Sequence, residues 1–228
     1  MKLQEIWALM IVDRYQPALS TFLSTQDELN ILTEALATSN PWGWRPGGQK
    51  SVVIENIKNK IRNFHLQRHG ERCCYCRVNL HGSGPFMIDR EHILPKSMSE
   101  YKPYSYSIWN LGIACKRCNM EYKKTKIDFI VVPSDPALLM DSATYLFIHP
   151  NFDFYREHMS RSVQEGEDGV LVKYTVVPGS IKGAYTYDYF NLRGLEVNSL
   201  DEVQGAKTQE ILGKVALEVR ALADIALM

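Results

Sequence analysis

The chain has 228 residues, 45% of them hydrophobic, and its 26 Lys and Arg residues balance 26 Asp and Glu residues. This composition is typical of a soluble globular protein, and it excludes collagen-like and low-complexity sequences. No apolar stretch approaches the ~18 residues that a membrane span requires. The short apolar run near the N-terminus also lacks the cleavage site of a signal peptide. We therefore expect a cytoplasmic protein with no membrane partner.

The net charge of zero hides an uneven distribution along the chain. Residues 45–77 include 8 basic and 2 acidic residues, residues 116–126 include 5 and 1, and residues 127–228 include 8 and 15. Basic segments favour a polyanionic partner, because neutralising phosphates releases counterions. Charge runs also commonly form solvated helix faces. Charge alone leaves both interpretations open.

The first seventy residues are predicted to form helices. Apolar residues recur at helical spacing between 29 and 36, after a predicted N-cap at Thr25. The Pro- and Gly-rich segment 40–48 must interrupt any helix. Ser51 then opens a second predicted helix, whose apolar face carries positions 54, 57, 61 and 64. We expect Lys58, Arg62 and Arg68 to lie largely away from that face.

Strands are predicted in the C-terminal part, with one more helix at its end. The predicted strands are 127–132, 143–148, 171–177 and 184–190, with a turn at Pro178-Gly179 between the last two. Residues 200–228 are predicted to form an amphipathic helix. We therefore divide the chain into an N-terminal helical region (1–70), a motif-bearing core (71–130) and a C-terminal α+β extension (131–228).

Four of the five cysteines form two C-x-x-C pairs, Cys73 with Cys76 and Cys115 with Cys118. In a reducing compartment such cysteines do not indicate disulfides. Zinc prefers four soft, tetrahedral ligands, and each C-x-x-C turn presents two thiolates. The 38 residues between the pairs exceed the ~15–20 of a zinc ribbon. We therefore predict a structural Zn²⁺ that joins the two ends of an inserted motif and leaves Cys74 unused.

The inserted segment carries a recognisable series of polar residues. It reads DREHILPKS at 89–97 and WNL at 109–111, and Asn119 follows the last cysteine. In this order the pieces resemble the HNH endonuclease family, the ββα-metal nucleases, in its zinc-stapled form. The resemblance covers residues 73–126, about a quarter of the chain. It implies an α+β fold in which a ββα core stapled by a four-cysteine zinc lies between N-terminal helices and a C-terminal α/β extension.

The resemblance assigns roles to four residues of this series. His92 is the general base, as befits an imidazole with a pKa of about 6.5. Glu91 and Asn119 are the ligands of a catalytic Mg²⁺ or Mn²⁺, because carboxylate and amide oxygens suit such hard ions. Asn110 belongs to the catalytic set as the residue that pins the hairpin and orients the histidine. Neighbouring strand residues point to opposite faces, so Glu91 and His92 share a site only if the strand is irregular there.

Each of these residues also has an ordinary structural interpretation. A lone His is usually a satisfied surface or core residue, and an Asn often caps a helix or forms a turn. Their joint placement between the cysteine pairs favours the nuclease site. Many family members carry a lysine three residues after the final Asn, where this chain has Tyr122 followed by Lys123.

The resemblance implies that the ββα unit enters the minor groove of DNA beside the scissile phosphate. Basic residues near the motif are then expected to bind the phosphate backbone, which gives affinity without sequence choice. These residues are Lys96, Lys116, Arg117, Lys123, Lys124 and Lys126. The aromatic residues of 101–106, with Trp42 and Trp44, either contact nucleic acid or pack on the core, and for the tryptophans we favour packing. No segment is typical of a recognition helix.

The string HPNFDFYREH at 149–158 loosely resembles segments that follow the HNH core in prokaryotic restriction and anti-phage nucleases. Some of those proteins are the nuclease halves of ATPase–nuclease pairs, so an activating partner such as an ATPase is expected. His149, Asp153 and His158 either form a second metal site or make structural hydrogen bonds, and we favour the second.

We therefore expect a metal-dependent HNH endonuclease that hydrolyses DNA, as a prokaryotic defence or restriction effector. One alternative is a zinc-stapled nucleic-acid-binding module without turnover. Another is an HNH nuclease that acts on RNA, because phosphodiester chemistry does not distinguish the two sugars.

Overall fold

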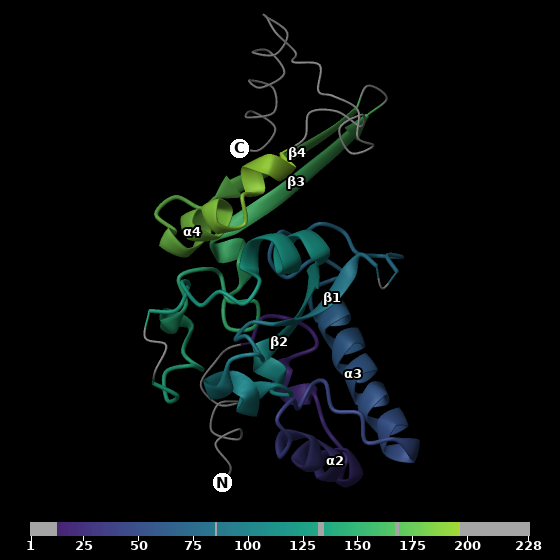
Figure 1. Ribbon diagram of the computed structural model, residues 1–228. Helices are drawn as coiled ribbons and strands as arrows, with labels where there is room; N and C mark the ends of the chain where they lie inside the picture. The colour runs from purple at the N-terminus through teal and green to yellow at the C-terminus, as the bar shows by residue number, and fades with distance from the viewer. Residues whose placement is uncertain (1–12, 85, 132–134, 167–168, 197–228) are drawn as a thin grey trace, which may run out of the picture. The chain divides into compact units, whose positions relative to one another are not determined.

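The computed structural model describes residues 13–84, 86–131, 135–166 and 169–196 (Figure 1). This part of the chain mixes helices with short antiparallel sheets. Its internal contacts define two compact units. One comprises the described residues up to Arg161 with Tyr174–Arg193, and the other comprises Ser162–Lys173 and the described residues from Gly194 on. The helix predicted at 200–228 lies outside the described residues. No helix in the described part is long and apolar enough to cross a lipid bilayer.

Helix α2 (Gln26–Leu36) confirms the first predicted helix, including its start. The hydroxyl of Thr25 accepts a hydrogen bond from the backbone N–H of Glu28, and the Glu28 carboxylate accepts one from the N–H of Thr25. This reciprocal capping box satisfies two backbone donors that the helix leaves open. A short 3-10 turn, Leu19–Thr21, precedes the helix.

Helix α3 (Gly48–Arg68) begins three residues before the predicted start at Ser51. Its predicted apolar face is confirmed at Ile54, Ile57 and Ile61, which are buried in the core together with Ala35, Tyr106 and Leu111. Glu28 and Glu34 of α2 form ion pairs with Lys60 and Lys50 of α3. Helix α3 is thus covered by α2 along one side.

The prediction that Lys58 and Arg68 lie away from the buried face is wrong, because both side chains are buried. The Arg68 guanidinium donates hydrogen bonds to the Asp13 carboxylate and the Pro17 carbonyl, each at 2.8 Å. The Lys58 ammonium lies 5.2 Å from the centre of a Trp42 ring. Segments that precede α3 in the sequence therefore cover what would otherwise be its polar face.

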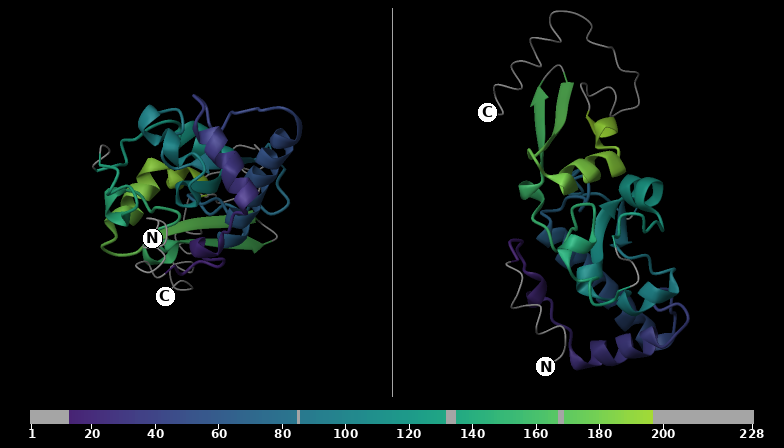
Figure 2. Two further views of the ribbon diagram at one scale, coloured as in Figure 1. Left: turned by 90° about the horizontal axis from the view of Figure 1, so that it is seen from below. Right: turned by 90° about the vertical axis from the view of Figure 1, so that its left-hand side faces the viewer.

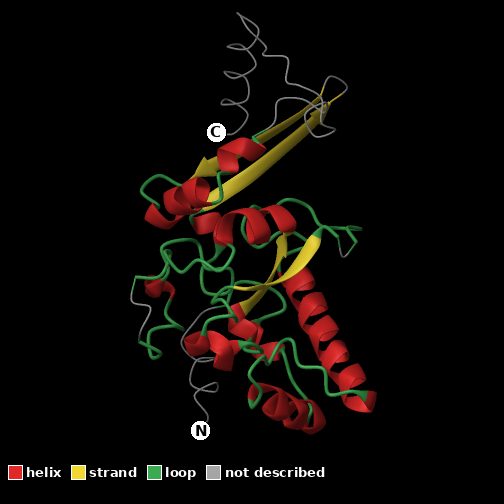
Figure 3. Cartoon of the chain, in the orientation of Figure 1, coloured by secondary structure: helices red, strands yellow, loops and turns green. Residues whose placement is uncertain are grey.

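The motif-bearing core is built on strands β1 (Ile88–His92) and β2 (Leu111–Cys115). They pair antiparallel, with Ile88 opposite Cys115 and His92 opposite Leu111. The connection contains two 3-10 helices, η2 (Ser99–Tyr104) and η3 (Ile108–Asn110). Strand β2 leads into a π-helix, η4 (Arg117–Lys123) (Figure 3). This order of strand, strand and helix agrees with the sequence-based expectation.

A second antiparallel pair, β3 (Met159–Gly166) and β4 (Gly169–Val176), forms a hairpin whose strands run side by side in every view (Figures 1 and 2). Strand β4 confirms the strand predicted at 171–177. The strand predicted at 184–190 is wrong, because helix α4 (Ile181–Tyr189) occupies these residues. Tyr185, Tyr187 and Tyr189 alternate as in a strand, but the Ser180 hydroxyl accepts the N–H of Gly183 and starts a helix.

The strands predicted at 127–132 and 143–148 are not formed in the described residues. A single antiparallel bridge joins Ile130 to Tyr145, and a 3-10 turn, Ser142–Thr144, precedes it. The aromatic side chains that favoured strands pack on one another instead. Phe129 and Phe147 are fully buried, with ring centres 4.3 Å apart. Two further 3-10 turns, Tyr155–Glu157 and Leu192–Leu195, complete the described elements.

Candidate functional site

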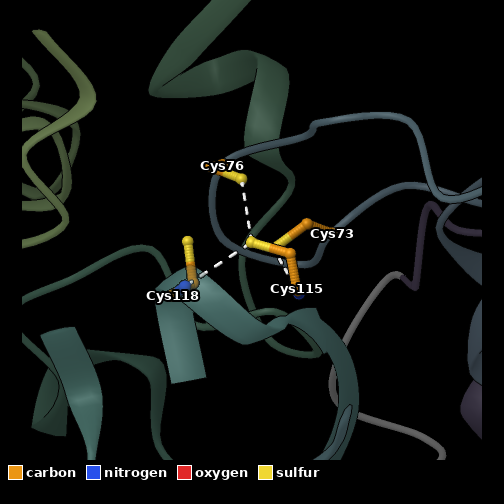
Figure 4. A group of neighbouring side chains, drawn as sticks. All are labelled: Cys73, Cys76, Cys115 and Cys118. Carbon is orange, nitrogen blue, oxygen red and sulfur yellow. Dashed lines mark hydrogen bonds between the residues drawn. The ribbon is translucent and has the colours of Figure 1, made fainter. Parts of the chain in front are cut away.

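The cysteines of the two C-x-x-C pairs converge on one point, although 38 residues separate the pairs. Their four sulfur atoms lie within 4.8 Å of one another, and all four residues are buried (Figure 4). The backbone N–H of Cys115 donates to the sulfur of Cys73 at 3.3 Å, and that of Cys118 donates to the sulfur of Cys115 at 3.5 Å. A compact, dry set of four sulfurs fits the tetrahedral coordination of a metal ion such as zinc.

Cys74 lies outside this cluster, as predicted. Its side chain is buried against Gly112, where an added Cβ would lie 3.4 Å from the Cys74 sulfur. Burial raises the pKa of the Cys74 thiol well above its usual value. A protonated, inaccessible thiol is inert, so Cys74 acts as a packing residue.

Residues far along the chain brace the cysteine cluster. The hydroxyl of Tyr174 donates a 2.6 Å hydrogen bond to the carbonyl of Cys76. The Arg117 guanidinium donates to the carbonyls of Phe190 and Asn191 at 2.9 and 2.8 Å. Arg117 was expected to contact phosphate, but its donors are used inside the protein. We therefore leave it out of the phosphate-contacting set.

A cavity of about 420 Å³ opens where β1 ends. It brings together Glu91, His92 and Asn119, as the sequence predicted, with Lys96 and Lys124 from the expected phosphate contacts. It also exposes residues that were not singled out from the sequence, which are Ser39, Asn40, Arg90, Pro95, Ser97, Lys102 and Thr125. The walls of the cavity are formed by strand β1, the connection after β1, η4 and the segment after α2.

His92 presents a neutral imidazole to this cavity. Its Nε2 lies 3.1 Å from the carbonyl oxygen of Ser105, which assigns the ring proton to Nε2. Its Nδ1 is buried and has no hydrogen-bond partner among the described residues. Burial, with the positive charge of Lys96, holds the pKa of His92 well below its usual value. Near neutral pH the ring therefore carries a free lone pair on Nδ1 that can accept a proton.

Asn110 fixes the surroundings of His92 without reaching the cavity. Its side-chain oxygen accepts the backbone N–H of Leu94 at 2.7 Å, and its amide donates to the carbonyl of Tyr104 at 3.2 Å. Leu94 follows His92 by two residues, and Tyr104 precedes the Ser105 carbonyl that holds the imidazole. Asn110 is fully buried and does not line the cavity, so its side chain orders the backbone around His92. Strand β1 stays in regular register with β2 through Glu91 and His92, and Asn110 bonds to Leu94 only where this pairing ends, so the irregularity expected at Glu91 and His92 is not observed.

Glu91 lines the cavity and is part of a buried ion pair. Its Oε1 accepts a hydrogen bond from the Tyr75 hydroxyl at 2.9 Å and lies 2.9 Å from the Lys123 ammonium. Burial raises the pKa of Glu91, and the charge of Lys123 opposes that shift. The Lys123 ammonium also donates to the His92 carbonyl at 2.8 Å, and only 1% of its side chain is exposed. Lys123 is therefore an internal counter-ion and lacks the exposed surface that a phosphate contact requires.

The π-helical turn explains why Lys123, one position later than in the family pattern, points inward. The N–H of Lys124 donates to the carbonyl of Asn119, five residues earlier, at 2.7 Å. A π-turn accommodates one more residue than an α-turn. The extra residue leaves Tyr122 at the surface, where its hydroxyl accepts from Arg117 at 3.1 Å.

Asn119 is oriented by an acidic residue whose role was not predicted. The Asn119 amide donates to one carboxylate oxygen of Asp89 at 2.9 Å, and Lys116 forms an ion pair with the other at 2.6 Å. The remaining polar atom of the Asn119 side chain is its carbonyl oxygen. Asp89 does not line the cavity, so it is a positioning residue for Asn119. The signal in the sequence was its spacing of two residues from Glu91 along a strand.

The other expected contacts are distributed over the surface and the core. Lys126 is exposed and lies 5.3 Å from the ring centre of Tyr189. Tyr101 and Tyr106 are buried, and Trp42 and Trp44 pack against the core cluster around α3, as we favoured for the tryptophans.

The segment 149–158 is used structurally. One carboxylate oxygen of Asp153 accepts from the backbone N–H of His149 and from Lys182, each at 2.7 Å. The Asn151 amide donates to the carbonyls of Trp109 and Leu111 on either side of Asn110. Within the described ranges, the cysteines form the only group of three or more His, Cys, Asp or Glu side chains placed to hold a metal.

Comparisons with known proteins give no match, whether with family models, curated proteins or solved structures. The geometry of the cavity and of the cysteine cluster therefore carries the functional interpretation by itself.

Proposed function

We propose that the protein is a metal-dependent HNH-type endonuclease that hydrolyses phosphodiester bonds in DNA, as a prokaryotic defence or restriction effector. One observation carries the proposal. His92, whose Nδ1 is buried and has no hydrogen-bond partner among the described residues, lines a cavity that also contains a carboxylate, an amide and several cationic side chains. The antiparallel hairpin followed by a helix, closed by four cysteines, supports it.

In this proposal the His92 Nδ1 removes a proton from the attacking water. The Ser105 carbonyl, which accepts the hydrogen bond from Nε2–H, stabilises the positive charge that the ring then acquires. Lys96, Lys102 and Lys124 line the cavity and offset the charge of the phosphate group. The Ser105 carbonyl and the lysines would thus each lie where charge develops, on the imidazole and on the phosphate group.

Glu91 and Asn119 would hold the divalent cation in this proposal. Their carboxylate and amide oxygens match the hard donors that Mg²⁺ and Mn²⁺ prefer, and both side chains line the cavity. A bound cation would stabilise charge on the phosphate and on the leaving oxygen. Asp89 and Asn110 would orient the residues that touch substrate or metal.

The zinc of this proposal is structural. A set of four cysteines leaves no open coordination position for water or substrate. Cys115 ends β2 and Cys118 lies in η4, so the metal would fix the hairpin, the helix and the first cysteine pair to one another. Its binding energy would then contribute to folding.

The test is cleavage of supercoiled plasmid by the purified chain with Mg²⁺ or Mn²⁺, with EDTA as a control and zinc measured in each preparation. We expect wild-type protein to nick or linearise the plasmid, and His92→Ala to lose about 10²–10⁴-fold in rate, as for loss of a general base. His81→Ala is the matched control, because 75% of the His81 side chain is exposed.

Equal cleavage by wild-type and His92→Ala proteins would refute the proposed site. Binding of DNA without cleavage under either metal would favour the binding-only module. A parallel reaction with labelled RNA decides between the two substrates, because cleavage of RNA alone would replace DNA in the proposal.

A further inference from the structure

The imidazole of His92 is held on a second side by a residue that lies fifty positions earlier in the chain. The rings of Trp42 and His92 have centres 4.4 Å apart and planes at 87°, which is an edge-to-face contact. Trp42 belongs to the segment between α2 and α3, outside the 73–126 region of family resemblance. The histidine therefore has two supports, the Ser105 carbonyl at Nε2 and the indole against its ring.

The Trp42 ring is itself held by two neighbours, Tyr106 and Lys58. Its ring packs on Tyr106, with centres 5.1 Å apart, and the Tyr106 hydroxyl donates to the carbonyl of Pro41 at 2.9 Å. The Lys58 ammonium lies 5.2 Å from the centre of an indole ring, and Lys58 is 1% exposed. The indole is thus held between α3 and the connection that precedes β2.

These two supports restrict different motions of the imidazole. A single hydrogen bond at Nε2 fixes one atom and still allows the ring plane to turn about that bond. An edge-to-face contact has a preferred geometry and restrains the plane. Together they determine where Nδ1 lies in relation to the cavity.

We infer that Trp42 is a positioning residue that holds the His92 imidazole against the cavity in the orientation in which Nδ1 has no hydrogen-bond partner among the described residues. Its catalytic importance rests on the proposed nuclease function. Trp42 does not line the cavity, so it contributes to the rate and not to substrate binding. A small misplacement of a catalytic group lowers the rate by about 10–100-fold.

The experiment compares Trp42→Ala and Trp42→Phe with Trp44→Ala and Trp44→Phe. Trp44 is the matched control, because it packs against the same core cluster and, within the part of the chain described, has no ring contact with His92. The readouts are the ¹⁵N resonances of the His92 ring at neutral pH, the zinc content, and kcat and KM for plasmid cleavage.

We expect wild-type protein and both Trp44 variants to show one Nε2-protonated His92 tautomer with narrow resonances. Trp42→Ala should show broadened or mixed resonances, a kcat lowered about 10–100-fold and an unchanged KM. Trp42→Phe should restore most of the His92 resonance pattern and most of kcat, because a phenyl ring keeps an aromatic edge or face against the imidazole.

Wild-type His92 resonances in Trp42→Ala would overturn the inference, even if the wild-type protein cleaves DNA. Equal losses of zinc and activity in Trp42→Ala and Trp44→Ala would overturn it as well, because they indicate general unfolding. Altered resonances in Trp42→Ala alone, with no cleavage by the wild-type protein, would support the positioning role and show that the isolated chain is not an active nuclease.

Discussion

The buried carboxylate of Glu91 is stabilised by the ammonium group of Lys123, which lies beside it. The two charged groups are 2.9 Å apart, with 1% and 2% of the Lys and Glu side chains exposed. A buried charge whose partner is removed costs about 3–5 kcal/mol. If Glu91 is a metal ligand, a divalent cation and the Lys123 ammonium act as alternative counter-ions for it.

Lys123→Met is therefore expected to bind Mn²⁺ at least about 10-fold more tightly than wild type in the absence of DNA, while losing about 3 kcal/mol of stability. Calorimetric titration with Mn²⁺ measures the first effect and chemical denaturation the second. Lys124→Met is the control, since Lys124 lines the same cavity but is exposed and has no ion pair within the described residues. Unchanged Mn²⁺ affinity in Lys123→Met would exclude Glu91 as a ligand.

At the scale of residues, the sequence predicted which side chains meet but not how each is used. Glu91, His92 and Asn119 share a cavity as expected, because motif order places them on adjoining elements. The spacing of Asp89 from Glu91 places both on one face of a strand, but the contact of Asp89 with Asn119 depends on what its side chain meets outside the strand. The inward turn of Lys123 depends on a π-turn, which leaves no local pattern that sequence reasoning can detect.

At the scale of elements, buried histidines in and directly after helix α3 are expected to make the stability of the protein sensitive to acid. His65 is fully buried, and burial, with the charge of Arg68, lowers its pKa to about 3 from a usual 6.5. His69, one turn later, is also buried with its pKa lowered. Below pH 6.5 the unfolded chain binds protons that the native protein does not, so stability falls as pH falls from about 6.5 toward 3.

We expect the lowered pKa of His65 alone to reduce the free energy of unfolding by about 2 kcal/mol when the pH falls from 7 to 5. Urea denaturation at both pH values should show that the free energy of unfolding falls by about 2 kcal/mol less in His65→Leu than in wild type. His81→Gln, at an exposed position, should behave like wild type. Acid also protonates zinc-bound thiolates, but that effect is common to all three proteins. Equal losses in His65→Leu and wild type would contradict the prediction.

Elements with capping signals were predicted well, and elements decided by packing were not. The capping box fixed the start of α2. The alternating tyrosines of 185–189 favoured a strand, yet Ser180 caps a helix there. The apolar runs around Phe129 and Phe147 form an aromatic cluster joined by a single antiparallel bridge and not two full strands, because the burial of large rings does not require a sheet.

At the scale of the whole molecule, the balanced charge hides a cluster of exposed cations at the cavity. Each phosphate that a protein neutralises contributes about −0.9 to the slope of log affinity against log salt. We expect Lys124→Ala, in a His92→Ala background that prevents cleavage, to make this slope shallower by about 0.9. Binding titrations from low to physiological salt measure it.

Lys50→Ala is the control for this measurement, because Lys50 forms an ion pair with Glu34 between α2 and α3 and does not line the cavity. Its slope should equal that of the parent protein. An unchanged slope for Lys124→Ala would show that the cavity does not receive the phosphate backbone.

The resemblance over residues 73–126 predicted the order of the core elements but none of its supports. Trp42 and Tyr174 belong to segments without a motif, and long-range contacts of this kind have no signature in a single sequence. The sequence therefore did not show that residues of the N-terminal helical region pack against the same core as residues of the motif-bearing segment.

This distribution of supports bears on how such a site can be inherited. Residues 73–126 alone would lack the indole of Trp42, the Tyr174 hydroxyl on the Cys76 carbonyl, and the carbonyls that hold Arg117. We therefore expect that residues 73–126 do not keep this site when they are moved into another protein. Gene fusions that carry it to a new context would have to include the chain from α2 through Asn191, so the flanking segments and the motif are expected to be transmitted and to diverge together.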